Sequence, residues 1–410
     1  MKLAVKKLLK QIFIFALIIL LFYSIFILLS HKKWLMIGND AEAGLYLTAS
    51  SYINKLYQGL LQIRSLKDFS NWLMAFFFHL SPFDLGEKPL FIMGLGYFSL
   101  VHTLFLKWIT LTADSLFNIF LIVICGYLLF LVFYNFNEPL FGISAVILIF
   151  LNIGLTTYSM SGYHTTFGVF VFLFFLYFYN KWQELNNRRV FISGFFISLM
   201  FFSSHHVIPL CMASFIFILY QIFSERKEKK LYFKHLIFFV TGISTLLLYF
   251  ALRDVMVSLG FLDEYRQAKV AKFFQDYFPG YIFKDFLYRA REAIDFNLPR
   301  GDLSYLYDYL KDFEGILFLP FLLLAIASPF LFRNITVNDF IEIFRKQKNY
   351  FYFREKKLFI FLLFNIALFI LTMVLIPLPY VARAYLPVAV LITICGVLGL
   401  SLSKQSLAMR

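Results

Sequence analysis

The sequence predicts an all-α polytopic membrane protein, on the evidence of its composition, its long apolar runs and the placement of its positive charges. Of the 410 residues, 61% are hydrophobic, 21% are aromatic and 15% are charged, and the mean hydropathy is +0.76. An average soluble protein carries about 25% charged residues. Several apolar runs approach the roughly 20 residues that a helix needs to cross a bilayer. We therefore expect one integral domain over 1–410, built as a bundle of about ten transmembrane helices.

The positive charges give the expected topology. The net charge is +14, and Lys and Arg cluster in short loops beside apolar runs. This placement is typical of cytoplasmic loops and not of a nucleic-acid-binding surface. The first apolar run is long for a signal peptide and no small-residue cleavage site follows it, so we expect it to remain as the first span. The expected spans are 11–30, 115–134, 139–157, 165–180, 190–204, 207–223, 236–252, 315–332, 358–377 and 385–402.

The apolar stretch 89–107 is expected to lie at the membrane surface instead of crossing. If it crossed, most of the basic loops that follow would move to the outer side, against the charge rule. Pro89, Gly94 and Gly96 suit an interfacial or re-entrant helix that other parts of the protein cover. The alternative is a full crossing offset by a further irregular span elsewhere. On the first interpretation, both termini are cytoplasmic and the protein is multi-pass in the plasma (inner) membrane.

Two large extracytoplasmic segments then remain, 31–114 and 253–314. Within the first, 41–63 has apolar residues at helical spacing and predicts a helix lying in the interface. The second mixes acids, bases and tyrosines, which predicts folded amphipathic elements. Every Asp and Glu falls in a loop on this map. A proton or ion pathway normally needs ionisable groups inside the membrane, so this placement weakens a transporter hypothesis.

Three short motifs stand out along the chain. An acidic pair, Asp40 and Glu42, follows the first span, the sequence EKPL stands at 87–90, and RAYLP at 383–387 opens the last span. In this order the motifs resemble those of the GT-C glycosyltransferases, above all the aminoarabinose transferases and protein O-mannosyltransferases. The likeness covers the first half of the chain and the final span. It implies a GT-C-like helical bundle with juxtamembrane helices in the first outer loop.

This chain departs from the family pattern at several positions. The EKPL motif has one proline where the family has two, and RAYLP has one inserted residue. Ala113-Asp114 stands where an Arg is frequent. His164 stands where a second acid is frequent, and His205-His206 where a Lys is common. The departures leave the sugar and any metal requirement open.

The resemblance implies a role for each motif residue. Asp40 would act as general base, and Glu42 as a second acid, an orienting group or a charge that stabilises the first helical turn. Lys88 and Arg383, with Tyr385 in the same motif as Arg383, would hold the phosphate of the leaving carrier. The alternatives are a solvated loop carboxylate for Asp40 and side chains that extend to lipid headgroups for the two cations.

A divalent metal is a possible cofactor, because Glu87 matches a position near a metal ion in the aminoarabinose transferases. His164, His205 and His206 would supply further ligands if they converge with Glu87. Otherwise these histidines contact water or headgroups, or donate hydrogen bonds to phosphate.

The expected function is transfer of a monosaccharide from a polyprenyl-phosphate carrier to an acceptor on the extracytoplasmic face, with inversion at the anomeric carbon. The acceptor can be a lipid, a glycan or a protein. One alternative is a lipid-linked sugar flippase or polysaccharide transporter, which would open to both faces in turn. Another is a polysaccharide polymerase or ligase, a class built around arginines and a histidine instead of an early acid.

Overall fold

In the computed structural model, all regular secondary structure among the described residues is helical, and no strand occurs in those ranges. The structure describes residues 2–31, 59, 61–69, 94–95, 98, 101–102, 105–106, 113–152, 155–156, 164–181, 186–203, 207–224, 229–256, 318–332, 335–336, 352–375 and 386–408. The prediction of an all-α chain is confirmed for these residues.

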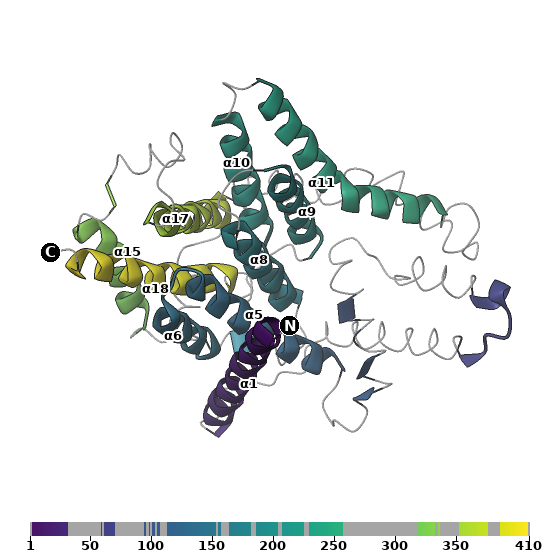
Figure 1. The fold of residues 1–410 in the computed structure, drawn as a ribbon, viewed down its shortest axis with the longest axis horizontal. Coiled ribbons are helices and arrows are strands. Elements are labelled where there is room, and N and C mark those ends of the chain that lie inside the picture. The colour runs from purple at the N-terminus through teal and green to yellow at the C-terminus, as the bar shows by residue number, and fades with distance from the viewer. Residues whose placement is uncertain are drawn as a thin grey trace, which may run out of the picture.

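Ten helices make up the described body (Figure 1). In chain order they are α1 (Lys2–His31), α5 (Ala113–Tyr134), α6 (Pro139–Phe150), α8 (His164–Lys181), α9 (Asn187–Ser203), α10 (Ile208–Ser224), α11 (Lys229–Met256), α15 (Phe318–Leu331), α17 (Tyr352–Leu375) and α18 (Leu386–Ala408). Each of the ten expected spans overlaps one of these helices. Three stretches are long and apolar enough to cross a membrane: Leu9–Leu28, Ser115–Tyr134 and Leu386–Lys404.

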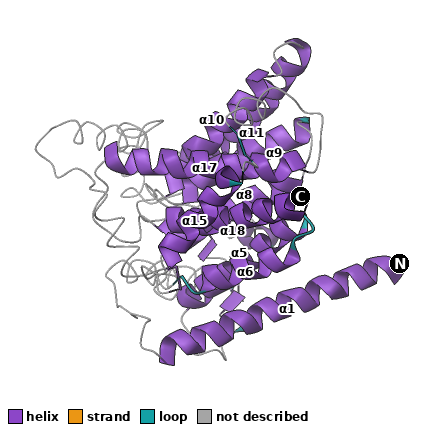
Figure 2. Cartoon of the chain, turned by 90° about the vertical axis from the view of Figure 1, so that its left-hand side faces the viewer, coloured by secondary structure: helices purple, strands orange, loops and turns teal. Residues whose placement is uncertain are grey.

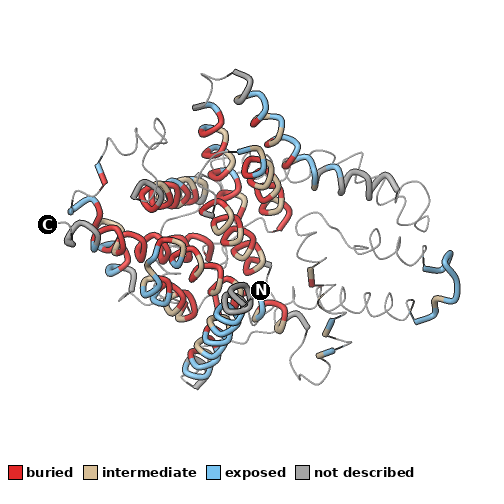
Figure 3. Tube along the Cα trace, in the orientation of Figure 1, coloured by how far each residue is buried: buried red, intermediate tan, exposed pale blue. Residues whose placement is uncertain are grey.

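The helices differ in how far the protein covers them. The apolar stretch of α18 is 94% buried and that of α1 only 17%. Accordingly, α18 lies inside the bundle (Figure 3), and α1 runs along its outside (Figure 2). Since α1 is apolar on its exposed side as well, its surface suits contact with lipid chains.

Local sequence signals account for where helices begin. Asn137 has a φ of 62°, a left-handed conformation that Asn tolerates better than most residues, and it turns the chain between α5 and α6. Pro139 then occupies the first turn of α6, where its missing N–H is no loss. The side chain of Asn186 accepts a hydrogen bond from the backbone N–H of Arg189 at 2.8 Å, which caps α9.

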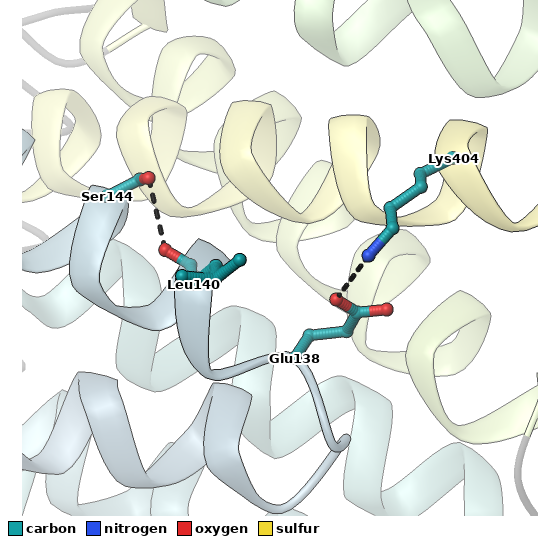
Figure 4. A network of polar contacts seen from close by, with 4 residues as sticks. All are labelled: Glu138, Leu140, Ser144 and Lys404. Atoms are coloured by element: carbon teal, nitrogen blue, oxygen red, sulfur yellow. Dashed lines mark hydrogen bonds and ion pairs between the residues drawn. The ribbon is translucent and has the colours of Figure 1, made fainter.

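Side-chain contacts fix the direction of α1, α5, α6 and α18. Lys10 Nζ near the start of α1 donates to Tyr134 Oη at the end of α5, at 3.0 Å. Lys404 Nζ near the end of α18 forms an ion pair with Glu138 Oε2 just before α6, at 3.1 Å (Figure 4). One end of the bundle therefore holds the start of α1, the end of α5, the start of α6 and the end of α18.

The other helices continue this alternation. Tyr179 near the end of α8 accepts a hydrogen bond from Gln221 near the end of α10, and Arg189 at the start of α9 lies over the Tyr179 ring. Phe361, in the first half of α17, stacks on Tyr179 with ring centroids 5.6 Å apart. Together these contacts place the ends of α8 and α10 beside the starts of α9 and α17.

The contacts of α11 and α15 show that these helices also alternate in direction. Tyr232 near the start of α11 packs on Phe223 near the end of α10, with ring centroids 5.6 Å apart. Ser328 near the end of α15 shares a 2.7 Å hydrogen bond with Ser403 near the end of α18. We call the end defined by Lys10, Glu138, Arg189 and Lys404 the basic end, and the opposite end, where α5 and α8 begin, the motif end.

Glycines allow two pairs of helices to touch through their backbones. A Cβ atom on Gly194 of α9 would lie 2.4 Å from the carbonyl oxygen of Phe239 in α11, and one on Gly242 of α11 would lie 2.2 Å from that of Phe191. A Cβ on Gly399 of α18 would lie 2.3 Å from the carbonyl oxygen of Ala325 in α15. Small residues that let backbones approach are the usual basis of helix association in membranes.

Helix boundaries differ from the expected spans at three acids. Glu355 was expected in a loop, but it lies in the first turn of α17 and is 4% exposed. Asp114 and Asp254 were also expected in loops, but α5 begins one residue before Asp114, and α11 continues through Asp254 to Met256. In each case the helix extends beyond its apolar run, because helices end where capping or packing stops them and not where hydrophobicity does.

Substituting Gly399 with Ala is expected to lower the midpoint of thermal unfolding (Tm) of the purified protein in detergent. The added methyl group would press on the backbone of Ala325, and overpacking of this kind costs about 1–3 kcal/mol. The control is Gly396→Ala, one turn earlier on the same helix, where the nearest atom to an added Cβ is the Leu322 side chain at 3.0 Å. Both changes gain the same helix propensity, so equal Tm values would contradict the packing argument.

Candidate functional site

One predicted site residue falls in a described element. His164 is the first residue of α8, and its side chain lies outside the described residues. The other predicted site residues also lie outside the described residues: Asp40, Glu42, Glu87, Lys88, His205, His206, Arg383 and Tyr385. The helices that precede and follow these residues in the sequence are described, however, and they show where each connection begins and ends.

The helices that flank these residues meet at the motif end. Because α1 and α5 run in opposite directions, the connection 32–112, with its two motifs, leaves and returns at that end. The same holds for 157–163 between α6 and α8, for 204–206 between α9 and α10, and for 376–385 between α17 and α18. Every predicted site residue therefore belongs to, or directly adjoins, a connection at one end of the bundle.

Few residues separate Arg383 from the start of α18. It precedes Leu386, the first residue of α18, by three positions, and Leu386 is fully buried. Three residues of extended chain span at most about 11 Å. The sequence therefore places Arg383 directly before the point at which α18 enters the bundle.

Part of the stretch 89–107 is described and packs on this end. Leu95 is 1% exposed and lies in a small apolar cluster with Phe117 and Leu121 of α5. Phe98 packs on Phe117, with ring centroids 5.3 Å apart, and Phe117 packs on Phe167 of α8 at 6.3 Å. The described contacts of this stretch thus fall in the first turns of α5 and α8.

Neutral polar side chains are buried near the motif end. Thr165 and Thr166 in the first turn of α8 are fully buried. Just beyond α6, the Asn152 side chain accepts a hydrogen bond from the backbone N–H of Leu155 at 2.8 Å, and Thr156 Oγ1 donates to the carbonyl of Phe150 at 3.0 Å. In α5, Asn118 is also fully buried. The described helices therefore offer uncharged hydrogen-bonding groups at this end.

Charged groups are buried at the basic end instead. Arg189 is 3% exposed, and its guanidinium carbon lies 4.5 Å from the centroid of the Tyr179 ring. Tyr179 Oη accepts a hydrogen bond from Gln221 Nε2 at 2.7 Å. Glu355 and Lys356 are buried in the first turns of α17. From the sequence, these basic residues were used only to predict which loops are cytoplasmic, and their burial was not predicted.

No group of three metal-ligating side chains occurs among the residues that the structure describes. Comparisons of the chain with known protein families, with curated proteins and with solved structures give no match. The candidate site accordingly consists of the motif-bearing connections and the neutral polar groups of the helix ends that they join.

Cysteines placed at the two ends are expected to be labelled from opposite sides of the membrane. Leu66 lies in the connection 32–112 and is 88% exposed, and Lys404 marks the basic end with a side chain 59% exposed. A membrane-impermeant maleimide should label one of Leu66→Cys and Lys404→Cys in intact cells, and the other only after permeabilisation. The native Cys125, Cys211 and Cys395 are buried, so they should give little background. Labelling of both variants from one side would contradict the assignment of the two ends.

Proposed function

We propose that this chain is an integral membrane glycosyltransferase of the GT-C type. It moves a monosaccharide from a polyprenyl-phosphate carrier to a hydroxyl-bearing acceptor on the extracytoplasmic face. The observation that supports the proposal is that the acidic pair, the EKPL motif and the RAYLP motif, far apart in sequence, stand in or beside connections whose flanking helices end and begin at the motif end. A reaction between a lipid-borne donor and an acceptor at the membrane surface needs such residues on one face.

The reaction proceeds by direct displacement. The hydroxyl oxygen of the acceptor attacks the anomeric carbon, and the bond from that carbon to the phosphate oxygen breaks. Asp40 takes the hydroxyl proton, and polyprenyl phosphate leaves with the electron pair of the broken bond. Attack from the side opposite the leaving group inverts the anomeric centre. Holding both substrates at one surface supplies much of the rate enhancement.

Lys88 and Arg383 stabilise the departing phosphate. Negative charge grows on the phosphate as the bond breaks, so a cation placed there lowers the barrier more than it strengthens ground-state binding. The place of Arg383 in the sequence, three positions before the buried start of α18, supports this role.

The proposed topology has ten crossings, with the basic end in the cytoplasm. Support comes from the buried and paired cations at that end, since cytoplasmic loops carry the excess of Lys and Arg. It also comes from the alternating directions of the helices, which return both large connections, 32–112 and 257–317, to the motif end. A divalent ion, if bound, would be held by Glu87 with histidines of neighbouring connections and would add positive charge beside the phosphate.

Substituting Asp40 with Asn is expected to slow sugar transfer by about 10²–10⁴-fold, because the amide cannot accept the hydroxyl proton. Membranes containing the variant would be supplied with radiolabelled polyprenyl-phosphate sugars, and transfer to endogenous acceptors would be measured. The matched control is Asp68→Asn in the same connection. The Asp68 carboxylate accepts a local hydrogen bond from the backbone N–H of Arg64 at 3.3 Å, is exposed, and should be dispensable. Undiminished transfer by Asp40→Asn would end its assignment as the base.

A further inference from the structure

Asn118 interrupts the most deeply buried side of α5. Asn118, Ile122, Cys125 and Leu129 recur at helical spacing, and each is at most 1% exposed. Three members of this stripe are apolar or nearly so, and they pack in the main hydrophobic core. Asn118 is the member nearest the motif end, in the second turn of the helix.

The amide of Asn118 has no hydrogen-bond partner among the residues that the structure describes. Both Nδ2 and Oδ1 are buried, and neither lies within hydrogen-bond distance of a suitable group in those residues. Asn365 in the middle of α17 is equally buried, and its Nδ2 donates to the carbonyl oxygen of Phe361 at 2.8 Å, whereas its Oδ1 has no partner among the described residues. Asn152 likewise bonds within its own turn. Among the buried asparagines that the structure describes, Asn118 is therefore the one in which both amide atoms lack a partner.

An unpartnered buried amide destabilises a folded protein, and it persists where it serves another purpose. An apolar residue of similar shape at position 118 would avoid the penalty. Local features that oppose stability concentrate at functional sites, where a ligand supplies the missing interaction.

The surroundings of Asn118 point to the same end of the molecule. Its neighbour Phe117 lies under the segment of Gly94 and Phe98, and a Cβ atom on Gly94 would lie 3.1 Å from the Phe117 ring. Further along the same stretch, His102 has a buried ring nitrogen, Nε2, that also lacks a partner in the described part of the chain. A second polar side chain with unmet hydrogen-bonding capacity thus belongs to the stretch that packs on the start of α5.

The chemistry of the amide selects the kind of ligand. Phosphate oxygens only accept hydrogen bonds, so a phosphate would satisfy Nδ2 and leave Oδ1 unmet. A hydroxyl group both donates and accepts, so one or two hydroxyl groups satisfy both atoms. We infer that Asn118 binds hydroxyl groups of the saccharide carried by the donor lipid, and so helps to determine which sugar is accepted. This inference rests on the proposed function, and because Asn118 is fully buried it requires that the contact between Phe98 and Phe117 opens when the sugar binds.

Asn118→Leu is expected to raise stability and to weaken sugar binding together. The leucine removes the unpartnered amide, so the Tm of the purified protein should rise. In nanodiscs, binding of undecaprenyl phosphate bearing glucose, mannose or arabinose would be compared with binding of bare undecaprenyl phosphate. We expect the variant to bind the preferred sugar-bearing carrier about 10-fold more weakly than the unmodified protein, the effect of losing one or two hydrogen bonds, and to bind the bare carrier equally well. Asn365→Leu is the matched control and should leave both affinities unchanged.

Each other result would overturn the inference. A lower Tm for Asn118→Leu would mean that the amide is satisfied inside the fold, for instance by a structural water. Equal weakening for the bare and sugar-bearing carriers, or no weakening, would show that Asn118 does not contact the sugar while the proposed function stands. If the unmodified protein binds no carrier of either kind, the proposed function itself fails, and the inference fails with it.

Discussion

The cost of placing polar groups inside an apolar bundle governs this structure. A backbone or side-chain polar group in hydrocarbon must find its partner within the protein. Some buried hydroxyls of the bundle meet this demand locally: Thr393 donates to the carbonyl of Ala389 and Ser403 to that of Gly399. Buried charge occurs instead at the basic end, where Arg189 lies over Tyr179. Polar chemistry with outside molecules is thereby confined to the two ends of the helices, and the ends differ in charge.

Because successive helices alternate in direction, several connections meet at one end of the bundle and can form a site there. Each connection returns the chain to the end it left, so the connections that carry motifs separated by hundreds of residues start and finish on the same side. The pairing of Glu138 with Lys404 brings the last helix to the turn after α5. Once that contact is fixed, α18 begins at the same end of the bundle at which α1 finishes. The proposed chemistry depends on this geometry more than on any single motif.

Much of the fold could be predicted from the sequence, because long apolar runs and the charges beside them are direct consequences of the membrane. The pairing of helices could not be. Gly194 and Gly242 are visible in the sequence, but a glycine does not indicate which backbone it approaches. Arg189 was predicted to lie in a basic loop, and only the structure shows it buried against Tyr179. For the candidate site, sequence motifs gave the order of residues but no distances. Asn118 did leave a signal, as a single amide within an apolar run, but its lack of a partner is a property of three-dimensional packing.

The same packing bears on the choice between a transferase and a transporter. A transporter that opens to both faces in turn must let helices slide or rock against each other. Here α9 meets α11 at Gly194 and Gly242, and α15 meets α18 at Gly399, through backbone contacts too close for any side chain. Interfaces of this kind resist sliding, because a shift of one residue brings a side chain against a backbone. Two such interfaces in separate parts of the bundle favour a body that stays fixed while substrates meet at one of its ends. A fixed body and a one-sided set of motifs are what sugar transfer at a membrane surface requires.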